Sequence, residues 1–466
     1  MHQVSDLMSL LALPHELLSE ICFQCRSHDL PKLRLTCKLL YHAATDHFLK
    51  ELKLYLTRES MNMAEKIGKS HPVLAKNIES CWIQADRLTP CRDFAHWRRE
   101  TFHGFASLKN LLTGGPRDEN WLESRYKHYV RLVNDQRDLC SGDHVARQVF
   151  TLFNACPNLQ ALWLTLGGQA RKSTTHQHQS FIDAACAPSQ DPLRMTNLGG
   201  AAAFQQSILA AAEANLQLHT LVVAGIGHMA LNEVEADDKV TTAVAKVLKT
   251  VQNLHLQVRS PEELPNEPDS SKVGPTLRQW FTGHHQDMAN LRHLHLELPP
   301  LQHFRSSSID FEDLIAELKF PYLRRLMLTQ FRADLTKLAD FLLAHSVTLQ
   351  TIRLANATGM GVMTWQSFFE SIAGKIVALK VVELRAHFTH HLQRWSDGYW
   401  RFSNTTRSKG SQFADALSEY IIHGGPRFPV QNEQSHLLSA QGRAFEVEVP
   451  LCDMPRVVDE DADEGG

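Results

Sequence analysis

A short apolar pattern, Leu-x-x-Leu-x-Leu, recurs seven times along the chain, with Val or Ile in place of Leu at some positions. The copies begin at Leu159, Leu218, Val251, Leu291, Leu323, Leu349 and Leu379. The alternation at the end of each copy predicts a short strand, because successive side chains on a strand point to opposite faces. The template positions then face a core, and the residue between the last two faces the other side.

Segments with helical periodicity lie between the copies. The clearest predicted helices are 145–154, 243–249, 311–318, 335–344 and 365–372. By subtraction the copies start 26 to 59 residues apart, mostly further than the about 20 to 29 residues of a regular leucine-rich repeat. The predicted fold class is therefore α/β, with an irregular leucine-rich-repeat-like solenoid in which parallel strands form one layer and helices the other.

A doubly wound α/β domain also alternates helices and strands, and it stays open as the alternative. Two observations favour the solenoid. The strands share one template and lack the long Val/Ile runs of strands buried on both faces. No Gly-rich phosphate loop follows a strand, and Leu166-Gly167-Gly168 leads into polar sequence.

Two segments before the first copy of the pattern are also assigned. Residues 48–68 are charged and compatible with a helix, and residues 74–83 alternate in the manner of a strand.

The N-terminus has a different pattern. Leu13-Pro14-His15-Glu16-Leu17-Leu18-Ser19-Glu20-Ile21 predicts a helix with Pro in its first turn, where the missing N–H has no partner to lose. Asp29 can cap a second short helix, and Thr36 can start a third. A unit of roughly 40 residues buries little surface alone, so some of its apolar side chains are expected to contact a partner.

These residues resemble an F-box. That family's pattern opens with Leu-Pro-x-Glu-Leu-Leu-x-x-Ile, has a Leu-rich middle, and closes on Cys-Lys before a bulky apolar residue. Leu40 departs from it, since many members have Trp there. The resemblance implies binding to the Skp-family adaptor of a cullin-RING ubiquitin ligase. The adaptor-binding residues would be Leu13, Pro14, Leu17, Leu18, Ile21, Leu30, Leu33, Cys37 and Leu40. The alternative is an amphipathic helical hairpin that fills the protein's own core.

The strand residues that face away from the core form a candidate recognition surface. The aromatic residue and the mixed charges of this surface suit a protein ligand better than a polyanion. The alternative is that this face of the sheet is exposed to solvent and binds no partner. The candidate target-binding residues are Trp163, His255, His295, Met327, Arg353 and Glu383. Val222 belongs to the same row, and Thr165, Ala224, Gln257, Glu297, Thr329, Ala355 and Arg385 form the row beside it.

Composition excludes several classes of function. With 48 Lys and Arg against 51 Asp and Glu, the formal charge is -3, which disfavours nucleic acid as a partner. Nine cysteines at irregular spacing predict a reducing compartment rather than a disulfide framework. We find no signal peptide and no apolar stretch long enough to cross a membrane. A soluble cytoplasmic or nuclear protein without a membrane partner is expected.

Motifs for chemistry are weak. Cys22-x-x-Cys25 with His28 has metal-like spacing, but no second pair follows, and burial explains Cys22 better. The histidine pairs at 176 and 178, 284 and 285, and 390 and 391 lack carboxylate or cysteine partners at ligand spacing. No hydrolase, metalloprotease, kinase or RING-like signature is present. The sequence predicts no metal, no cofactor and no catalytic residue.

The predicted domains are an F-box at 8–56, a solenoid at 70–423 and a C-terminal extension with an acidic tail at 424–466. Residues 167–200, 260–275 and 459–464 have the composition of loops or disordered segments. Together the features resemble fungal F-box proteins with leucine-rich-repeat-like domains. The resulting hypothesis is a non-catalytic substrate receptor that binds a Skp-family adaptor, through it a cullin, and an unknown target protein. A repeat scaffold outside any ligase and an α/β enzyme are the rivals.

Overall fold

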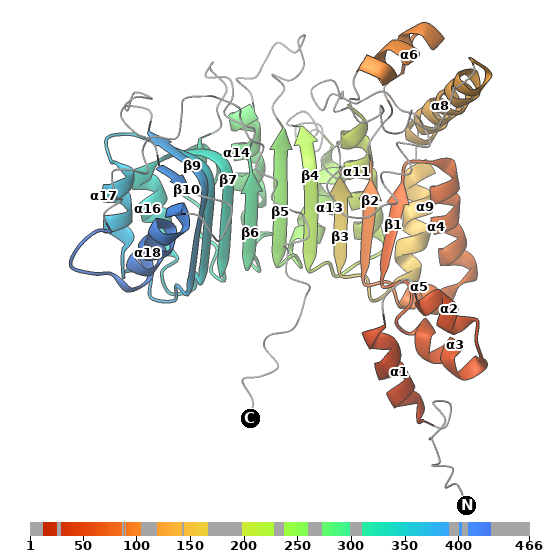
Figure 1. Cartoon of the computed structure of the whole chain (residues 1–466), viewed down its shortest axis with the longest axis horizontal. Coiled ribbons are helices and arrows are strands. Elements are labelled where there is room, and N and C mark those ends of the chain that lie inside the picture. Colours follow the sequence, from red (N-terminus) through yellow and green to blue (C-terminus); the bar gives the residue numbers. More distant parts are fainter. Residues whose placement is uncertain are drawn as a thin grey trace, which may run out of the picture.

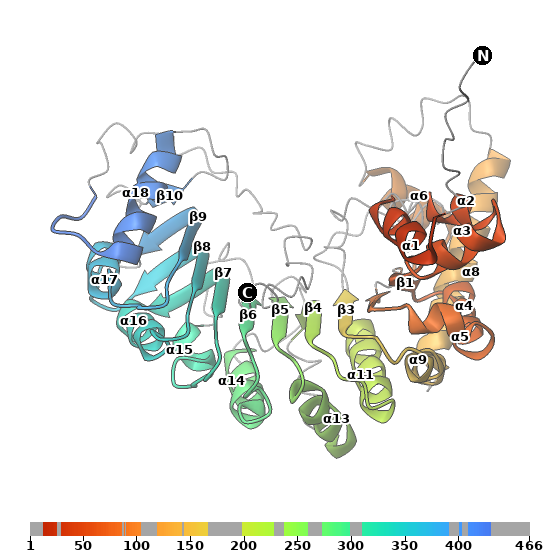
Figure 2. The same ribbon diagram turned by 90° about the horizontal axis from the view of Figure 1, so that it is seen from below.

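The computed structural model describes residues 13–25, 29–85, 88, 90–103, 119–141, 144–165, 198–227, 237–259, 273–298, 310–390, 400–402 and 409–429. Ten strands in these residues form one sheet, and their order in the sheet follows their order in the chain. All neighbouring strands are parallel except the last pair, which is antiparallel. The sheet bends into an arc with the helices on its outer side (Figure 2). The solenoid prediction is confirmed over the doubly wound alternative, which needs helices on both faces.

The strands of the sheet differ in length. Their bounds are β1 (Glu51–Tyr55), β2 (Ser80–Gln84), β3 (Ala161–Thr165), β4 (Thr220–Gly227), β5 (Asn253–Arg259), β6 (His293–Glu297), β7 (Arg325–Asp334), β8 (Thr351–Met360), β9 (Val381–His390) and β10 (Trp400–Phe402). Strands β7, β8 and β9 are the longest, with 10 residues each.

The helices fall into three groups. The N-terminal module holds α1 (His15–Gln24), α2 (Leu30–Arg34) and α3 (Lys38–Thr45). A separate pair is α6 (Phe94–His103) and α8 (Glu119–Cys140). The helices associated with the sheet are α4 (Arg58–Ser70), α5 (Pro72–Lys76), α9 (His144–Ala155), α11 (Leu198–Glu213), α13 (Asp238–Leu248), α14 (Val273–His284), α15 (Phe311–Leu314), α16 (Leu335–Ala344), α17 (Trp365–Ile372) and α18 (Lys409–His423).

Capping side chains fix where several solenoid helices begin. Asp237 accepts a hydrogen bond from the backbone N–H of Lys239 at 2.9 Å, and Asp334 accepts one from Thr336 at 2.8 Å. Thr364 does the same for α17. Each cap pairs an N–H that has no partner inside its helix. The strand-to-helix turns are thus set locally.

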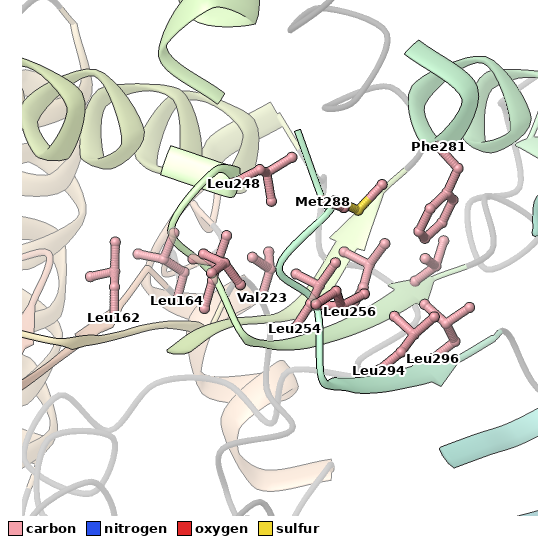
Figure 3. Packing of buried hydrophobic residues seen from close by; sticks show 14 of the residues in the cluster. Leu162, Leu164, Val223, Leu248, Leu254, Leu256, Phe281, Met288, Leu294 and Leu296 are labelled. Carbon is pink, nitrogen blue, oxygen red and sulfur yellow. The ribbon is translucent and has the colours of Figure 1, made fainter. Parts of the chain in front are cut away.

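The template side chains form one continuous core between the sheet and the helices. Leu162, Leu164, Val223, Leu254, Leu256, Leu294 and Leu296 point to the same side of their strands, toward Leu248, Phe281 and Met288 (Figure 3). All apolar template positions of the seven predicted strands belong to this core. Burial of this apolar area is the main stabilising term of the solenoid.

Two N-terminal expectations were wrong. Residues 48–68 are not one helical stretch, because Glu51–Tyr55 is strand β1 and α4 follows. Residues 74–83 are not one strand, because Pro72–Lys76 is helix α5 and β2 begins at Ser80. Pro72 supplies a helix start that the alternation obscures. The sheet therefore begins inside the range assigned to the F-box, while the domain boundaries themselves stay a prediction.

A kink recurs at the sixth residue of four strands. Gly225, Gln330, Asn356 and Ala386 all have positive φ, between 50° and 79°. The residue pairing shifts next to this position between β4 and β5 and between β8 and β9. After the kink, β7, β8 and β9 continue to pair, so these strands are longer than the template predicts.

The N-terminal module, residues 13–50, has a small core of its own. Its fully buried members are Leu18, Cys22, Leu30, Leu40, Ala43 and Ala44. The side-chain amide of Asn77 donates a hydrogen bond to the backbone carbonyl of Thr45 at 2.6 Å. Lys50 forms an ion pair with Glu79 at 2.9 Å. The module is thus attached to the N-terminal end of the arc (Figure 1).

Helices α6 and α8 form a second small cluster beside the first strands. It contains Leu88, Trp97, Leu122, Tyr129 and Val133. At the other end of the arc, α18 packs Leu417 and Ile421 into the main core. Both ends of the sheet are therefore accompanied by additional structure.

Candidate functional site

The N-terminal module exposes apolar side chains on α1, on α3 and just after α2. Leu17 on α1 is 51% exposed, and Leu35 after α2 is 88% exposed. Other exposed apolar side chains of the module are Ile21, Phe23, Leu39 and Tyr41. Exposed apolar side chains on so small a module make its surface a candidate for binding another protein.

The structure divides the predicted adaptor-binding residues into two sets. Leu17, Ile21 and Pro14 are exposed, and Leu13, Leu33 and Cys37 are partly buried. Leu18, Leu30 and Leu40 lie in the module's own core, so they have almost no surface to offer a partner. Their position indicates a role in folding the module. Phe23, Leu35, Leu39 and Tyr41 were not predicted, although each is an apolar residue near the motif.

Side chains within the module join α1 to the segment after α3, and α2 to α3. Ser19 Oγ lies 2.8 Å from His47 Nε2, across the helices. Arg34 donates from Nε to Thr45 Oγ1 at 3.0 Å, and its guanidinium lies 4.4 Å from the ring centroid of Phe48. These contacts hold the exposed residues in a fixed arrangement, which lowers the entropy lost on binding a partner.

The concave face of the sheet carries residues in two continuous rows. We call the first the middle row, and the strand register places its members side by side: Lys53, Trp82, Trp163, Val222, His255, His295, Met327, Arg353 and Glu383. The upper row is Tyr55, Gln84, Thr165, Ala224, Gln257, Glu297, Thr329, Ala355 and Arg385. All six candidate target-binding residues therefore lie in one line.

Aromatic side chains gather at the N-terminal end of the middle row. The ring centroids of Trp82 and Trp163 are 6.3 Å apart, and the ammonium of Lys53 lies 4.8 Å from the Trp82 ring. Trp82 donates its indole N–H to Thr165 at 3.0 Å. All three middle-row side chains are partly exposed. Large, oriented aromatic surfaces of this kind are frequent anchors in protein interfaces.

Charged side chains of both rows gather at the C-terminal end of the concave face. Glu383 accepts from Arg353 at 2.8 Å through one oxygen and from Arg385 at 2.8 Å through the other. Each side chain is between 26% and 40% exposed. The two guanidinium groups share one carboxylate, so this end of the face keeps a net positive charge.

The centre of the middle row is buried. His255 and His295 are 3% and 4% exposed, and their rings stack with centroids 3.9 Å apart. Burial lowers the pKa of His255 to about 3 and holds that of His295 well below its usual range. Both imidazoles are therefore neutral near pH 7. Their accessible surface is too small to offer a bound protein the contact area that the partly exposed Trp163 has.

Other residues with candidate chemistry have structural partners. Cys22 is buried, as expected, and burial raises its pKa. His284 does have a carboxylate partner, contrary to the prediction, because Asp287 lies three residues later in the turn after α14, with Nδ1 and Oδ2 3.4 Å apart. His390 Nε2 lies 2.9 Å from the Met363 carbonyl. His28, His176, His178 and His391 lie outside the described residues.

Sequence reasoning missed Lys53 and Trp82 because it started the array at the third strand. The signal was present, since Leu49-x-x-Leu52-x-Leu54 matches the template in full. Ile78-x-x-Cys81-x-Ile83 matches it with Cys in the central position, and Cys81 is fully buried. A buried thiol behaves as a small apolar residue, so Cys belongs in such a template.

Comparison with known proteins gives one family match and one similar solved structure. Residues 10–52 match the F-box domain. The chain thus contains an F-box domain, whose described part is the N-terminal module. A solved structure, the leucine-rich repeat-containing protein LegL7 from Legionella pneumophila, is similar with a TM-score of 0.23 and 9% identity. That match covers 79% of this chain and 97% of the other. No curated protein sequence matches this chain.

Among the described helices, none combines the length and the apolar character that a bilayer-spanning segment needs.

Proposed function

We propose that this protein is a substrate-recognition subunit of a Skp–cullin–F-box ubiquitin ligase. The observation that carries the proposal is an F-box domain at residues 10–52 whose helices expose Leu17, Ile21 and Leu35. This domain would bind the Skp-family adaptor and, through it, the cullin. The chain would work in the cytoplasm or the nucleus as a non-catalytic subunit.

The solenoid would hold the target protein. Its concave face combines the tryptophan pair at one end with the Arg353–Glu383–Arg385 group at the other. Aromatic anchors and arginines are the side chains that contribute most to protein interfaces. Trp163, Met327, Arg353 and Glu383 keep partial exposure, so these candidates have surface to offer a target.

The mechanism would be proximity. Asn77 and the Lys50–Glu79 pair attach the F-box domain to the first strands of the sheet. A target on the concave face would then be held at a defined position relative to the adaptor. Such positioning raises the effective concentration of a target lysine near the ubiquitin-charged enzyme without chemistry by the receptor itself.

The experiment is co-purification of the chain with a Skp-family adaptor, comparing wild type with the Leu17→Asp/Ile21→Asp double variant. Both side chains are exposed, so the variant should fold, as circular dichroism can verify. The Val347→Asp/Val377→Asp variant is the matched control, because it places the same charges on exposed positions of the solenoid.

We expect stoichiometric adaptor binding by wild type and control, and none by the F-box variant. If folded wild type does not bind any Skp-family adaptor, the receptor function is wrong, and a repeat scaffold outside a ligase becomes the better account. Equal binding by the F-box variant would show that these exposed residues are not the docking surface.

A further inference from the structure

Two imidazoles and a carboxylate meet at the centre of the concave face. His255 lies on β5, and His295 and Glu297 lie on β6. The register pairs His255 with His295, and Glu297 follows two residues later on the same face of the strand. Ligand atoms of the three residues all lie within 4.8 Å of one another. The strand register, rather than spacing along the chain, brings them together.

The imidazoles have unused ligand atoms in a buried setting. Within the described part of the chain, neither Nδ1 nor Nε2 of His255 has a hydrogen-bond partner, and neither does Nε2 of His295. Buried polar atoms without partners are rare in native proteins, because water solvates them in the unfolded chain. Their presence at one point, beside a 9% exposed carboxylate, indicates a ligand that completes the group.

The chemistry of the donors selects the ligand. A neutral imidazole offers the lone pair of one ring nitrogen to a metal ion. The carboxylate supplies negative charge. Imidazole nitrogen suits borderline transition ions such as Zn²⁺, whereas Ca²⁺ and Mg²⁺ prefer oxygen ligands throughout. Three protein ligands with a fourth position left open is a common arrangement for Zn²⁺.

We propose that His255, His295 and Glu297 bind one divalent transition-metal ion of the Zn²⁺ class. The fourth coordination position is taken by water or by a donor atom of a protein bound on the concave face. This site does not depend on the F-box domain or on adaptor binding.

Metal binding requires a small rearrangement of the rings. The ring planes are 19° from parallel, so the lone pairs of the two rings lie in nearly parallel planes and do not converge on one point. Side-chain rotation must make them converge until the donor atoms lie about 3.3 Å apart around the ion. Arg353 adds positive charge near His295, and its ion pair with Glu383 at 2.8 Å offsets only part of that charge, because Arg385 pairs with the same carboxylate.

The test titrates Zn²⁺ into metal-free full-length protein by isothermal calorimetry. We expect one high-affinity Zn²⁺ per chain in wild type. The His255→Gln and Glu297→Gln variants should bind it at least about tenfold more weakly. His219→Gln is the control, because it removes a partly buried imidazole at the start of β4, outside this group, and it should leave the affinity unchanged.

A second measurement covers the case in which a variant fails to fold. Co²⁺ added to wild type should give the intense visible bands of a four-coordinate ion without a thiolate-to-metal charge-transfer band. A charge-transfer band would place the ion on cysteines and overturn the proposal. Absence of Zn²⁺ and Co²⁺ binding by folded wild type, or equal affinity in wild type and the folded site variants, would overturn it as well.

Discussion

The F-box domain and the solenoid use leucine in opposite ways. In the solenoid, the template residues are buried under the helices, and the opposite face of the sheet carries polar and aromatic side chains. In the F-box domain, Leu18, Leu30 and Leu40 fill a small core while Leu17, Leu35 and Leu39 remain exposed. A repeat array extends one core over many strands, whereas a module of roughly 40 residues has little interior to bury its apolar side chains. Apolar residues of a repeating pattern are therefore buried in one region, whereas the other region leaves several of its leucines exposed.

The largest expected effect is loss of a template leucine. Leu326 is fully buried in β7, so Leu326→Ala should lower the free energy of unfolding by about 2–5 kcal/mol through lost transfer energy and a residual cavity. Leu39→Ala in the F-box domain, at a 46% exposed position, should change it by less than about 0.5 kcal/mol. Urea unfolding of both variants measures the difference. If both variants lost the same free energy of unfolding, the distinction between buried leucines in the solenoid and exposed leucines in the F-box domain would be wrong.

His345 provides the next largest effect and a pH dependence. Its Nδ1–H donates to the Phe341 carbonyl at 2.8 Å, and its Nε2 accepts from the Phe320 N–H at 3.0 Å, so the buried ring is neutral. Burial lowers its pKa below the ordinary 6.5. Below a pH of about 6.5 the unfolded chain therefore binds a proton that the folded chain does not. The free energy of unfolding consequently decreases as the pH is lowered.

His345→Gln should cost about 1–3 kcal/mol at pH 7, because it disturbs two buried hydrogen bonds. The loss of stability between pH 7.5 and 5.5 should also be smaller in this variant than in wild type. Urea unfolding at both pH values tests this. The same pH slope in the two proteins would show that His345 does not contribute to acid sensitivity.

Sequence periodicity predicted most of the solenoid. Seven strands and helices such as Leu335–Ala344 and Trp365–Ile372 follow directly from the spacing of apolar residues. Strand β1 was missed although it matches the template, because its charged neighbours are helix-compatible, and β2 was obscured by the helix that begins at Pro72. The antiparallel strand β10 was not predicted, because its sequence does not match the Leu-x-x-Leu-x-Leu pattern.

The candidate surfaces were predicted less completely. The alternation of side chains along each strand is enough to place Arg353, Glu383 and Arg385 on the sheet face that points away from the core, which is the concave face. The contact between His255, His295 and Glu297 depends on the register of two strands, which spacing along the chain does not show. Likewise, the F-box motif names its apolar residues but not which of them its own core buries.

The connection between the two regions should contribute less than either core. Asn77→Ala removes the hydrogen bond to the Thr45 carbonyl and should lower the free energy of unfolding by about 1 kcal/mol. The loss should appear as faster amide exchange in α3 rather than in the central strands. Faster exchange in β5 and β6 instead would mean that the F-box domain supports the whole sheet.

The smallest expected effect is on the concave face. Arg385 is 40% exposed, and its ion pair with Glu383 is partly screened by water. Arg385→Ala should therefore change the free energy of unfolding by less than about 1 kcal/mol, as measured by urea unfolding. A larger loss would show that this group stabilises the solenoid and is less free to serve a target.

Hydrogen–deuterium exchange of the full-length chain, with and without a Skp-family adaptor, tests the central claim most directly. The account predicts slower exchange in α1, α2 and α3 on adding the adaptor, and unchanged exchange in strands β3 to β9. Protection in the strands with none in the three helices, or no protection anywhere at saturating adaptor, would contradict it.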